Sequence, residues 1–480
     1  MWRSAAVVLL AFSPCLAAPV GMADEGAATA QASRAAQPVS DWSELGSREE
    51  LMDARDHAAG EFRAAYAAGR YNDALRHADR VLALTQAMPW TAADLPAAFD
   101  NRAAVHFRLG DYVAAEQDFS DSINLLGDRN AAASPRLIGP LQGLGFTYAA
   151  AGQYDAATVV LERALQISQR SSGLFNLDQL DLLDPLITSD VALGHGRDAD
   201  RHHVYAYQVA AHHYGPRDER LIPALGKLAR WYGQTGRFAR ARELYAQVLA
   251  IATPEGERLL WASIMALRGT AETYRTAYQD GSEDPNAIEP EYGQPSLESD
   301  AKYYLDDDGR RKLETALKLI EAHEPPLPEA RAVLLIELGD WALLKGKPER
   351  AWPRYSQAWP AMPNPGDGAD ASAEAVVSRL NPLAYPARLL YRRPPAADAY
   401  RDRKAGTVVE HAAVAEFTVT PAGRVRDATV VEGDATTSQQ HAFTRALAYA
   451  IYRPRFVDGK PVSTDKVRYR ETFLQLKRSH

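Results

Sequence analysis

The chain has 480 residues, of which 46% are hydrophobic and 24% charged, and its formal net charge is -8. This composition is ordinary for a folded soluble protein, and the length leaves room for two or three domains. The negative balance, with the bases scattered over one small C-terminal domain, argues against nucleic acid as a partner.

The first 23 residues have the pattern of a secretory signal peptide. Arg3 supplies the positive charge, residues 5–12 supply the apolar core, and residues 21–23 form a small-x-small cleavage site before Asp24. The apolar run is far shorter than the roughly 20 residues that a membrane helix needs. Cleavage and export are therefore predicted, and an uncleaved membrane anchor is the alternative.

The sole cysteine, Cys15, lies inside this signal segment. Cleavage before Asp24 leaves a mature chain that can form no disulfide, which fits an oxidising compartment. The next segment, residues 24–41, is rich in Ala, Gln, Ser and Gly and has no periodicity. It is predicted to be a disordered leader.

Residues 42–362 are organised by a repeat. Gly69, Gly110, Gly152, Gly194 and Gly236 follow one another at intervals of 41, 42, 42 and 42 residues. Alanine stands five positions after each glycine, and mostly large side chains recur at offsets 9, 12 and 13, which share one face of a helix. Each repeat is therefore predicted to be a pair of helices that reverses at the glycine and buries its apolar stripe against neighbouring repeats.

This Gly, Tyr, Ala pattern resembles the tetratricopeptide (TPR) family, although the period is longer than the roughly 34 residues usual there. The resemblance implies a mainly α superhelix of helical hairpins. We expect its concave face, built from the first helix of each pair, to bind a peptide or helix through residues that include Tyr148 and Tyr232. The period breaks at an acidic insertion, residues 279–304, which is either a functional excursion or a tolerated surface loop. It then resumes up to Gly346, which makes seven hairpins in all.

After a linker rich in Pro, Gly and Asp, residues 363–380, a period of two replaces the helical period. Strands are predicted over 407–419 and 424–431 with a turn between them, followed by a helix over 442–452 and a last strand over 466–476. Two strands, a helix and a strand make a small antiparallel sheet covered on one face. Residues 381–480 are therefore predicted to be a small α+β domain.

Several separated motifs in this domain resemble the C-terminal domain of TonB energy transducers. They are Tyr385-Pro386, Thr420-Pro421-Ala422-Gly423, Tyr452-Arg453-Pro454 and Gly459-Lys460-Pro461. In that family the domain lies in the bacterial periplasm and engages outer-membrane transporters, whose short N-terminal segment adds as a strand to the domain's edge.

The TonB resemblance implies that Tyr385, Pro386 and the last strand form a partner-binding edge. The candidate residues on that strand are Val467, Arg468, Tyr469 and Arg470. A terminal strand with unpaired backbone groups is independently a template for strand addition. The alternative for Tyr385 and Pro386 is that they only dock the linker on the sheet. A TonB transducer also needs an uncleaved membrane helix and a Pro-rich spacer, so energy transduction is in doubt for this chain.

Charge divides the chain into two parts. From Arg388 to the end there are 17 Lys and Arg against 10 Asp and Glu, a net charge of plus 7, which leaves minus 15 of the total of minus 8 to the preceding residues. The C-terminal domain is therefore expected to favour acidic partners.

Patterns of catalysis or metal binding are absent from the sequence. His202 and His213 share a helix face, but 1.5 Å of rise per residue places them about 16 Å apart, too far for one ion. They are predicted to be surface or groove histidines. No G-x-S-x-G, H-E-x-x-H or Walker motif occurs. The sequence thus predicts neither an enzyme nor a cofactor.

The prediction for the whole chain is a periplasmic adaptor that binds protein or peptide partners and has no membrane segment in its mature form. The TPR groove would hold one partner and the C-terminal domain another by strand addition. The alternatives are a component of TonB-dependent energised transport, which touches outer-membrane receptors, and a structural scaffold of an envelope assembly.

Overall fold

The structure is a computed structural model that describes residues 47–127, 133–252, 257–280, 298–362, 382–384, 386–390 and 408–476. The predicted signal segment, leader and linker, and most of the predicted acidic insertion, lie outside these residues. By its contacts the chain divides into two compact units, Met1–Asp94 and Leu95–His480.

The first unit holds one helical hairpin, α1 (Arg48–Ala67) and α2 (Tyr71–Ala87), followed by the 3₁₀ helix η3 (Pro89–Asp94). A capping box starts α1, because the Ser47 side chain accepts from the Glu50 amide and the Glu50 carboxylate accepts from the Ser47 amide. The buried face of α1 carries Leu51 and Phe62, at the helical spacing that the sequence predicts.

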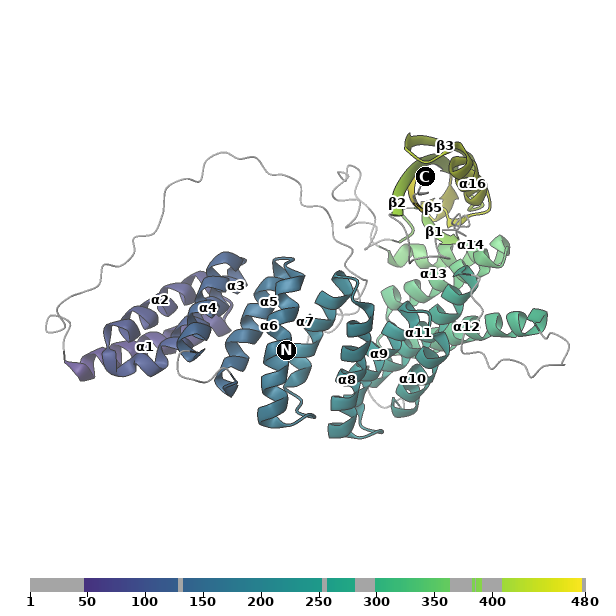
Figure 1. Cartoon of the computed structure of the whole chain (residues 1–480). Helices are drawn as coiled ribbons and strands as arrows, with labels where there is room; N and C mark the ends of the chain where they lie inside the picture. The colour runs from purple at the N-terminus through teal and green to yellow at the C-terminus, as the bar shows by residue number, and fades with distance from the viewer. Residues whose placement is uncertain are drawn as a thin grey trace, which may run out of the picture. The chain divides into compact units, whose positions relative to one another are not determined.

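The second unit begins with six further hairpins, so the described residues contain the seven that the repeat predicts (Figure 1). The pairs are α3 (Leu95–Leu109) with α4 (Tyr112–Gly127), α5 (Ile138–Ala150) with α6 (Tyr154–Ser172), α7 (Gln179–Ala192) with α8 (Gly196–Tyr214), α9 (Ile222–Gln234) with α10 (Phe238–Ile251), α11 (Glu257–Asp280) with α12 (Glu298–Glu321), and α13 (Pro328–Leu344) with α14 (Pro348–Ala358). Within this unit each hairpin packs on the next. Two short 3₁₀ helices, η4 (Pro135–Leu137) before α5 and η5 (Glu219–Leu221) before α9, take up part of the extra length of the repeat, and a third, η6 (Trp359–Ala361), follows α14.

The repeated glycines make the turns of these hairpins, as predicted. Gly152 has φ 75°, a left-handed value that only glycine adopts without strain, and the second helix begins two residues later at Tyr154. The amide of Gln153 donates to the carbonyl of Tyr148 at 2.8 Å, which closes the helix end. The repeated alanine, Ala157, is fully buried, so the two helices can approach closely.

Among the residues that the structure describes, the C-terminal part of the second unit contains seven strands and one helix. They are β1 (Ala387–Leu390), β2 (Val408–Val419), β3 (Val425–Gly433), α16 (Thr437–Ala448), β4 (Ile451–Arg453), β5 (Arg455–Val457), β6 (Lys460–Val462) and β7 (Thr464–Leu476). The longest sheet is antiparallel with the order β3-β2-β7, while β1 pairs with β4 and β5 with β6. Phe417 from β2 and Phe443 and Leu447 from α16 are buried together, so α16 covers one face of the sheet.

The predicted helix over 442–452 is partly wrong. A capping box between Thr436 and Gln439 starts α16 earlier, at Thr437, and the helix ends at Ala448. Ile451 to Arg453 instead form β4, because these residues pair with β1 and are buried on both sides. A strand so short leaves no periodic pattern in a sequence, and its partner lies about 60 residues earlier in the chain.

Candidate protein-interaction site

Strand β7 is the outermost strand of the three-stranded sheet. Its pairing with β2 extends from Val408 opposite Leu476 to Val419 opposite Thr464, with a single irregularity near Phe417. Among the described strands, none pairs with the other side of β7. Successive residues of a strand direct their backbone groups to alternate sides, so about half of the backbone groups of β7 face away from β2.

The four candidate residues of β7 divide between the two faces of the sheet. Val467 and Tyr469 are half-buried on the face covered by α16, where the Tyr469 ring lies 6.0 Å from that of Phe443. Arg468 and Arg470 are exposed on the opposite face. This alternation follows from the period of two of a strand.

Tyr469 is held in place by charged neighbours. The guanidinium of Arg388 lies 4.7 Å from the centre of its ring, and its hydroxyl donates to the carboxylate of Glu471 at 3.2 Å. Burial raises the pKa of Tyr469, and the negative charge of Glu471 raises it further. The phenol therefore stays neutral and acts as a hydrogen-bond donor at neutral pH.

The other edge of the sheet, β3, is irregular. Its register with β2 shifts at two places, between Val414 and Ala415 and between Glu416 and Thr418. Asp427 of β3 has φ 55°, a value that non-glycine residues rarely adopt. Bulges of this kind twist an edge and hinder further pairing. Strand β7 has one such place, at Lys466 with φ 56° beside the register shift near Phe417, and its pairing is regular from Val467 to Leu476.

The segment that carries the Tyr-Pro motif packs against the helical hairpins. Tyr385 lies outside the described residues, and Pro386 is half-buried. On either side of them, Leu383 and Leu389 are buried in one cluster with residues of α13 and α14. The neighbours of the motif thus pack on the helical hairpins, while Arg388, two residues after Pro386, lies over the ring of Tyr469 in β7.

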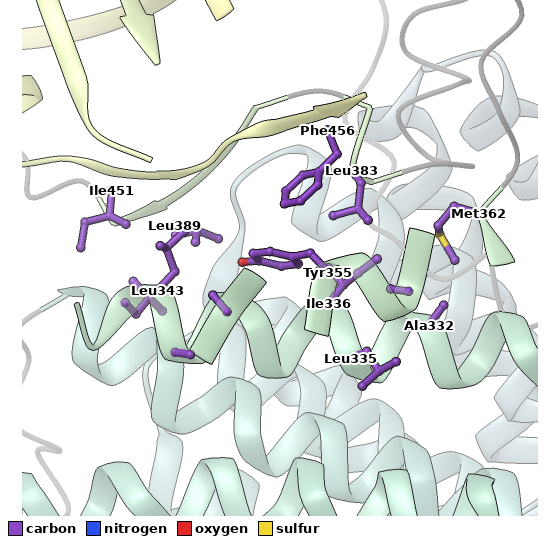
Figure 2. Packing of buried hydrophobic residues seen from close by; sticks show 14 residues of the cluster. Ala332, Leu335, Ile336, Leu343, Tyr355, Met362, Leu383, Leu389, Ile451 and Phe456 are labelled. Atoms are coloured by element: carbon purple, nitrogen blue, oxygen red, sulfur yellow. The ribbon is translucent and has the colours of Figure 1, made fainter. Parts of the chain in front are cut away.

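The contact with the hairpins is a continuous apolar core between α13, α14 and the C-terminal strands. Figure 2 shows the ring of Tyr355 beneath Phe456 and Leu383, with Leu389 beside Leu343. The rings of Tyr355 and Phe456 meet edge to face with centres 5.1 Å apart. Tyr355 is fully buried, and it packs over Gly339 of α13, where a Cβ atom would collide with the ring.

A buried ion pair lies within this core. The Asp340 carboxylate of α13 accepts from Nη1 of Arg453 in β4 at 2.8 Å and 3.1 Å, and from the Tyr355 hydroxyl at 2.8 Å. Asp340 is 4% exposed and Arg453 8% exposed, so neither charge is solvated. Burial raises the pKa of Asp340, against the lowering effect of Arg453 and of Arg275. The arrangement fixes the strands on the last helical hairpin through one set of matched charges.

The C-terminal strands therefore act as the end cap of the helical repeats. Eleven of the 17 residues of α13 are buried, so this helix is apolar nearly all round. A repeat array leaves its last apolar face open unless a cap covers it, and here Leu389, Ile451 and Phe456 supply that cover. Sequence reasoning missed Asp340, which is one of two acids, with Glu337, inside the apolar run Leu334 to Leu344.

The two candidate tyrosines of the hairpins occupy equivalent positions, each four residues before a turn glycine. The Tyr148 hydroxyl donates to the Glu116 carboxylate at 3.0 Å, and both residues line a pocket of about 430 Å³ together with Tyr112 and Val113. Burial raises the pKa of Tyr148, and Glu116 adds to the effect. Tyr232 lies on α9, under the Arg237 guanidinium at 4.1 Å from its ring centre, and does not line this pocket.

One of the two helix-face histidines is not on the surface as predicted. His202 is buried, and its Nδ1 lies 2.8 Å from the carboxylate of Asp190. Asp190, His195 and Asp198 could together approach one cation, since their ligand atoms lie within 4.8 Å of one another. Asp190 already bonds His202, and Asp198 pairs with Arg201 at 3.1 Å, so both carboxylates have partners.

Comparison with known proteins identifies the family of two stretches of the helical hairpins. Residues 141–178 and 224–259 each match a family model of the tetratricopeptide repeat, and no curated protein matches the chain. The chain therefore carries TPR repeats. Such repeats generally mediate contacts between proteins and typically serve as non-enzymatic scaffolds.

Several solved structures are similar to this chain at low identity. TPR-like repeats named for a kinesin light chain of Podosopora anserina are 19% identical, with a TM-score of 0.37, over 42% of this chain and 94% of that one. BtubC from P. vanneervenii is 15% identical, with a TM-score of 0.33, over 67% and 96%. The TPR2AB domain of yeast Sti1, solved as a pHSP90 complex, is 13% identical, with a TM-score of 0.24, over 68% and 96%.

Within the described residues, no helix combines the length and the apolar character that crossing a membrane requires.

Proposed function

We propose that the protein is a periplasmic adaptor that holds two protein partners, one on its TPR helices and one along β7. The observation that carries the proposal is the edge position of β7, which is long, regularly paired on one side and joined to no described strand on the other. Such an edge binds an extended segment through backbone hydrogen bonds. The TPR repeats support the first half of the proposal, because repeats of this kind generally bind proteins or peptides.

The C-terminal module, residues 382–476 as far as they are described, offers other sheet edges besides β7, and each of these is covered or irregular. The contacts of Leu383, Leu389, Ile451 and Phe456 with α13 and α14 cover the side of β1, β4 and β5. Strand β3 is bulged and its register shifts twice. Strand β7 is regular from Val467 to Leu476, and among the described strands it pairs on one side only.

The module is proposed to be TonB-like in fold. The support is the order of its elements, in which β2, β3, α16 and β7 follow the motifs that resemble the TonB C-terminal domain. Its close packing on α13 and α14 differs from a domain carried on a long spacer, and it favours an adaptor over an energy transducer. Participation in energised transport across the outer membrane is the alternative that the TonB-like motifs favour.

The location of the chain and its membrane attachment are tested by the mature N-terminus. Export with cleavage predicts a periplasmic protein that begins near Asp24. A chain that keeps residues 1–23 and fractionates with the inner membrane would favour the transport alternative instead.

Strand addition is tested by the register of crosslinks. A photo-reactive amino acid is placed in turn at Arg468, Arg470 and Thr472, which point to the same face of β7, in the full-length protein. In a paired strand, moving two residues along β7 moves the contacted position by two residues along the partner. We expect the attached positions to shift in this regular way along one extended segment.

The matched controls carry the same reagent at Arg426 on the opposite edge strand and at Arg445 on α16, both exposed. Adducts that scatter over the partner's surface, or that form equally at Arg426, would refute β7 as the pairing edge. The TPR half is tested separately with the reagent at Val113, which is 80% exposed beside the Tyr148 pocket.

A further inference from the structure

The outward side chains of β7 form a basic row. Arg468 and Arg470 alternate with Val467 and Tyr469, Lys466 lies at the bulge that ends this regular stretch, and all three basic residues are exposed. We propose that β7 selects an extended partner segment with acidic side chains at alternate positions, and that Arg470 is the residue that recognises them. This inference rests on strand addition at β7, and it names the chemistry of the partner.

Arg470 is the cation of this row that is best placed for a partner. It lies opposite Val414 of β2, an apolar residue that cannot neutralise it. Within the described part of the chain, no ion pair involves Arg470. By contrast, Nε of Arg468 lies 3.1 Å from the carboxylate of Glu416 on β2. The charge of Arg468 is thus already compensated, while that of Arg470 faces solvent.

In a paired strand, the charge of Arg470 would favour partner segments that carry a carboxylate opposite it. Residues directly opposite one another on adjacent strands have Cβ atoms about 5 Å apart, so they interact strongly on the same face. A carboxylate opposite Arg470 gains a charge-assisted contact, whereas a lysine there meets a like charge. The remaining side chains of the incoming segment face the side of Val467 and Tyr469, where apolar residues extend the row covered by α16.

Acidic groups on the sheet limit the length of this basic row. Asp465 precedes Lys466 and accepts from the Thr418 hydroxyl at 3.1 Å, and Glu410 lies exposed near the far end of β2. These groups repel a carboxylate beyond either end of the row. The partner's acidic positions are therefore expected to face residues 466–470 only.

A second copy of this chain is disfavoured on the same edge where two β7 strands pair about Tyr469. Two copies of β7 related by a two-fold axis pair residues whose numbers add up to a constant, so even-numbered residues meet even-numbered ones on the same face. In the register centred on Tyr469, Arg468 of each copy lies opposite Arg470 of the other. Like charges directly opposite destabilise a strand pair, so an acidic segment of another protein is the favoured occupant.

The test uses the full mature protein and two short synthetic probes, a Glu-Val repeat peptide and a Lys-Val repeat peptide. Binding is followed by titration calorimetry, and hydrogen exchange of β7 amides reports whether a strand has been added. We expect the Glu-Val peptide to bind more tightly by about 2- to 30-fold, the range set by one attractive against one repulsive cross-strand pair. The preference should shrink as salt is added.

The variant Arg470→Glu should reverse the preference, and Arg445→Glu on α16, with the same change of charge, should leave it intact. Arg468→Glu should have an intermediate effect because Glu416 already neutralises that arginine.

Two results would overturn the inference, and they are distinguishable. If both peptides slow β7 exchange equally and Arg470→Glu changes nothing, strand addition stands but charge selection is wrong. If neither peptide slows β7 exchange at millimolar concentration, strand addition itself fails, and the proposed function with it.

Discussion

The buried ion pair between α13 and β4 allows a quantitative test of how the C-terminal module is attached. The variant Asp340→Leu leaves the Arg453 guanidinium, whose side chain is 10% exposed, without its carboxylate. It also removes the acceptor of the Tyr355 hydroxyl. Removing one partner of a buried pair typically costs about 3–5 kcal/mol, since the remaining charge is neither solvated nor compensated.

The variant Arg453→Met should lower the free energy of unfolding by less than Asp340→Leu does. In Arg453→Met the carboxylate of Asp340 keeps the Tyr355 hydroxyl, and the positive charge of Arg275 still lowers its pKa. The double variant Asp340→Leu with Arg453→Met replaces the pair by apolar atoms, so it should be more stable than Asp340→Leu alone. The expected coupling between the two positions is about 1–3 kcal/mol.

The assay is hydrogen exchange of peptides from β4 and α13 in the full-length protein, because it measures local opening without assuming that the whole chain unfolds at once. A loss of about 3 kcal/mol corresponds to an opening that is about 150 times more frequent. The control is Glu321→Leu, which breaks an exposed pair with Arg331 of 2.9 Å and should cost less than about 1 kcal/mol. If Asp340→Leu accelerates exchange no more than Glu321→Leu does, the ion pair does not hold the module in place.

Three further predictions concern pH and backbone strain. Burial lowers the pKa of His203 to about 4, below its ordinary 6.5, so the free energy of unfolding falls as pH falls from about 6.5 to 4. The variant His203→Phe keeps the stacking on Trp231 and should remove about 2 kcal/mol of this loss, as measured in thermal scans. Burial raises the pKa of Asp100 to about 6 from 3.8, so stability falls as pH rises between these values; Asp100→Asn should flatten that slope and raise the Tm at pH 7, and an unchanged slope would contradict this. Gly423 and Gly194 both have positive φ, but an added Cβ at Gly423 would collide with a carbonyl of β4, whereas one at Gly194 would meet open space. In urea unfolding, Gly194→Ala should lower the free energy of unfolding by about 1–2 kcal/mol, and Gly423→Ala should lower it by clearly more.

The helical hairpins could be predicted from the sequence in detail. The turn at Gly152, the start of the next helix at Tyr154 and the buried Ala157 all follow from spacing, because each depends on residues within about one helical turn. The long strands β2 and β7 were predicted to within a few residues for the same reason, since their alternation is a local property.

The short strands could not be predicted in this way. Strand β4 was read as the end of a helix, because its three residues adopt an extended form only in order to pair with β1. The start of α16 was missed as well, although its signal, the capping box of Thr436 and Gln439, was present in the sequence.

The sequence by itself determined the repeat, its turns and the alternation that makes β7 basic on one face and apolar on the other. Only the tertiary structure decided that the C-terminal strands cap α13 and α14, and that Asp340 and Arg453, 113 residues apart, form one buried ion pair. The physical reason is that the sequence pattern reflects interactions between residues close together in the chain. Periodicity records which face of an element is apolar, but it carries no information on which other element will cover that face.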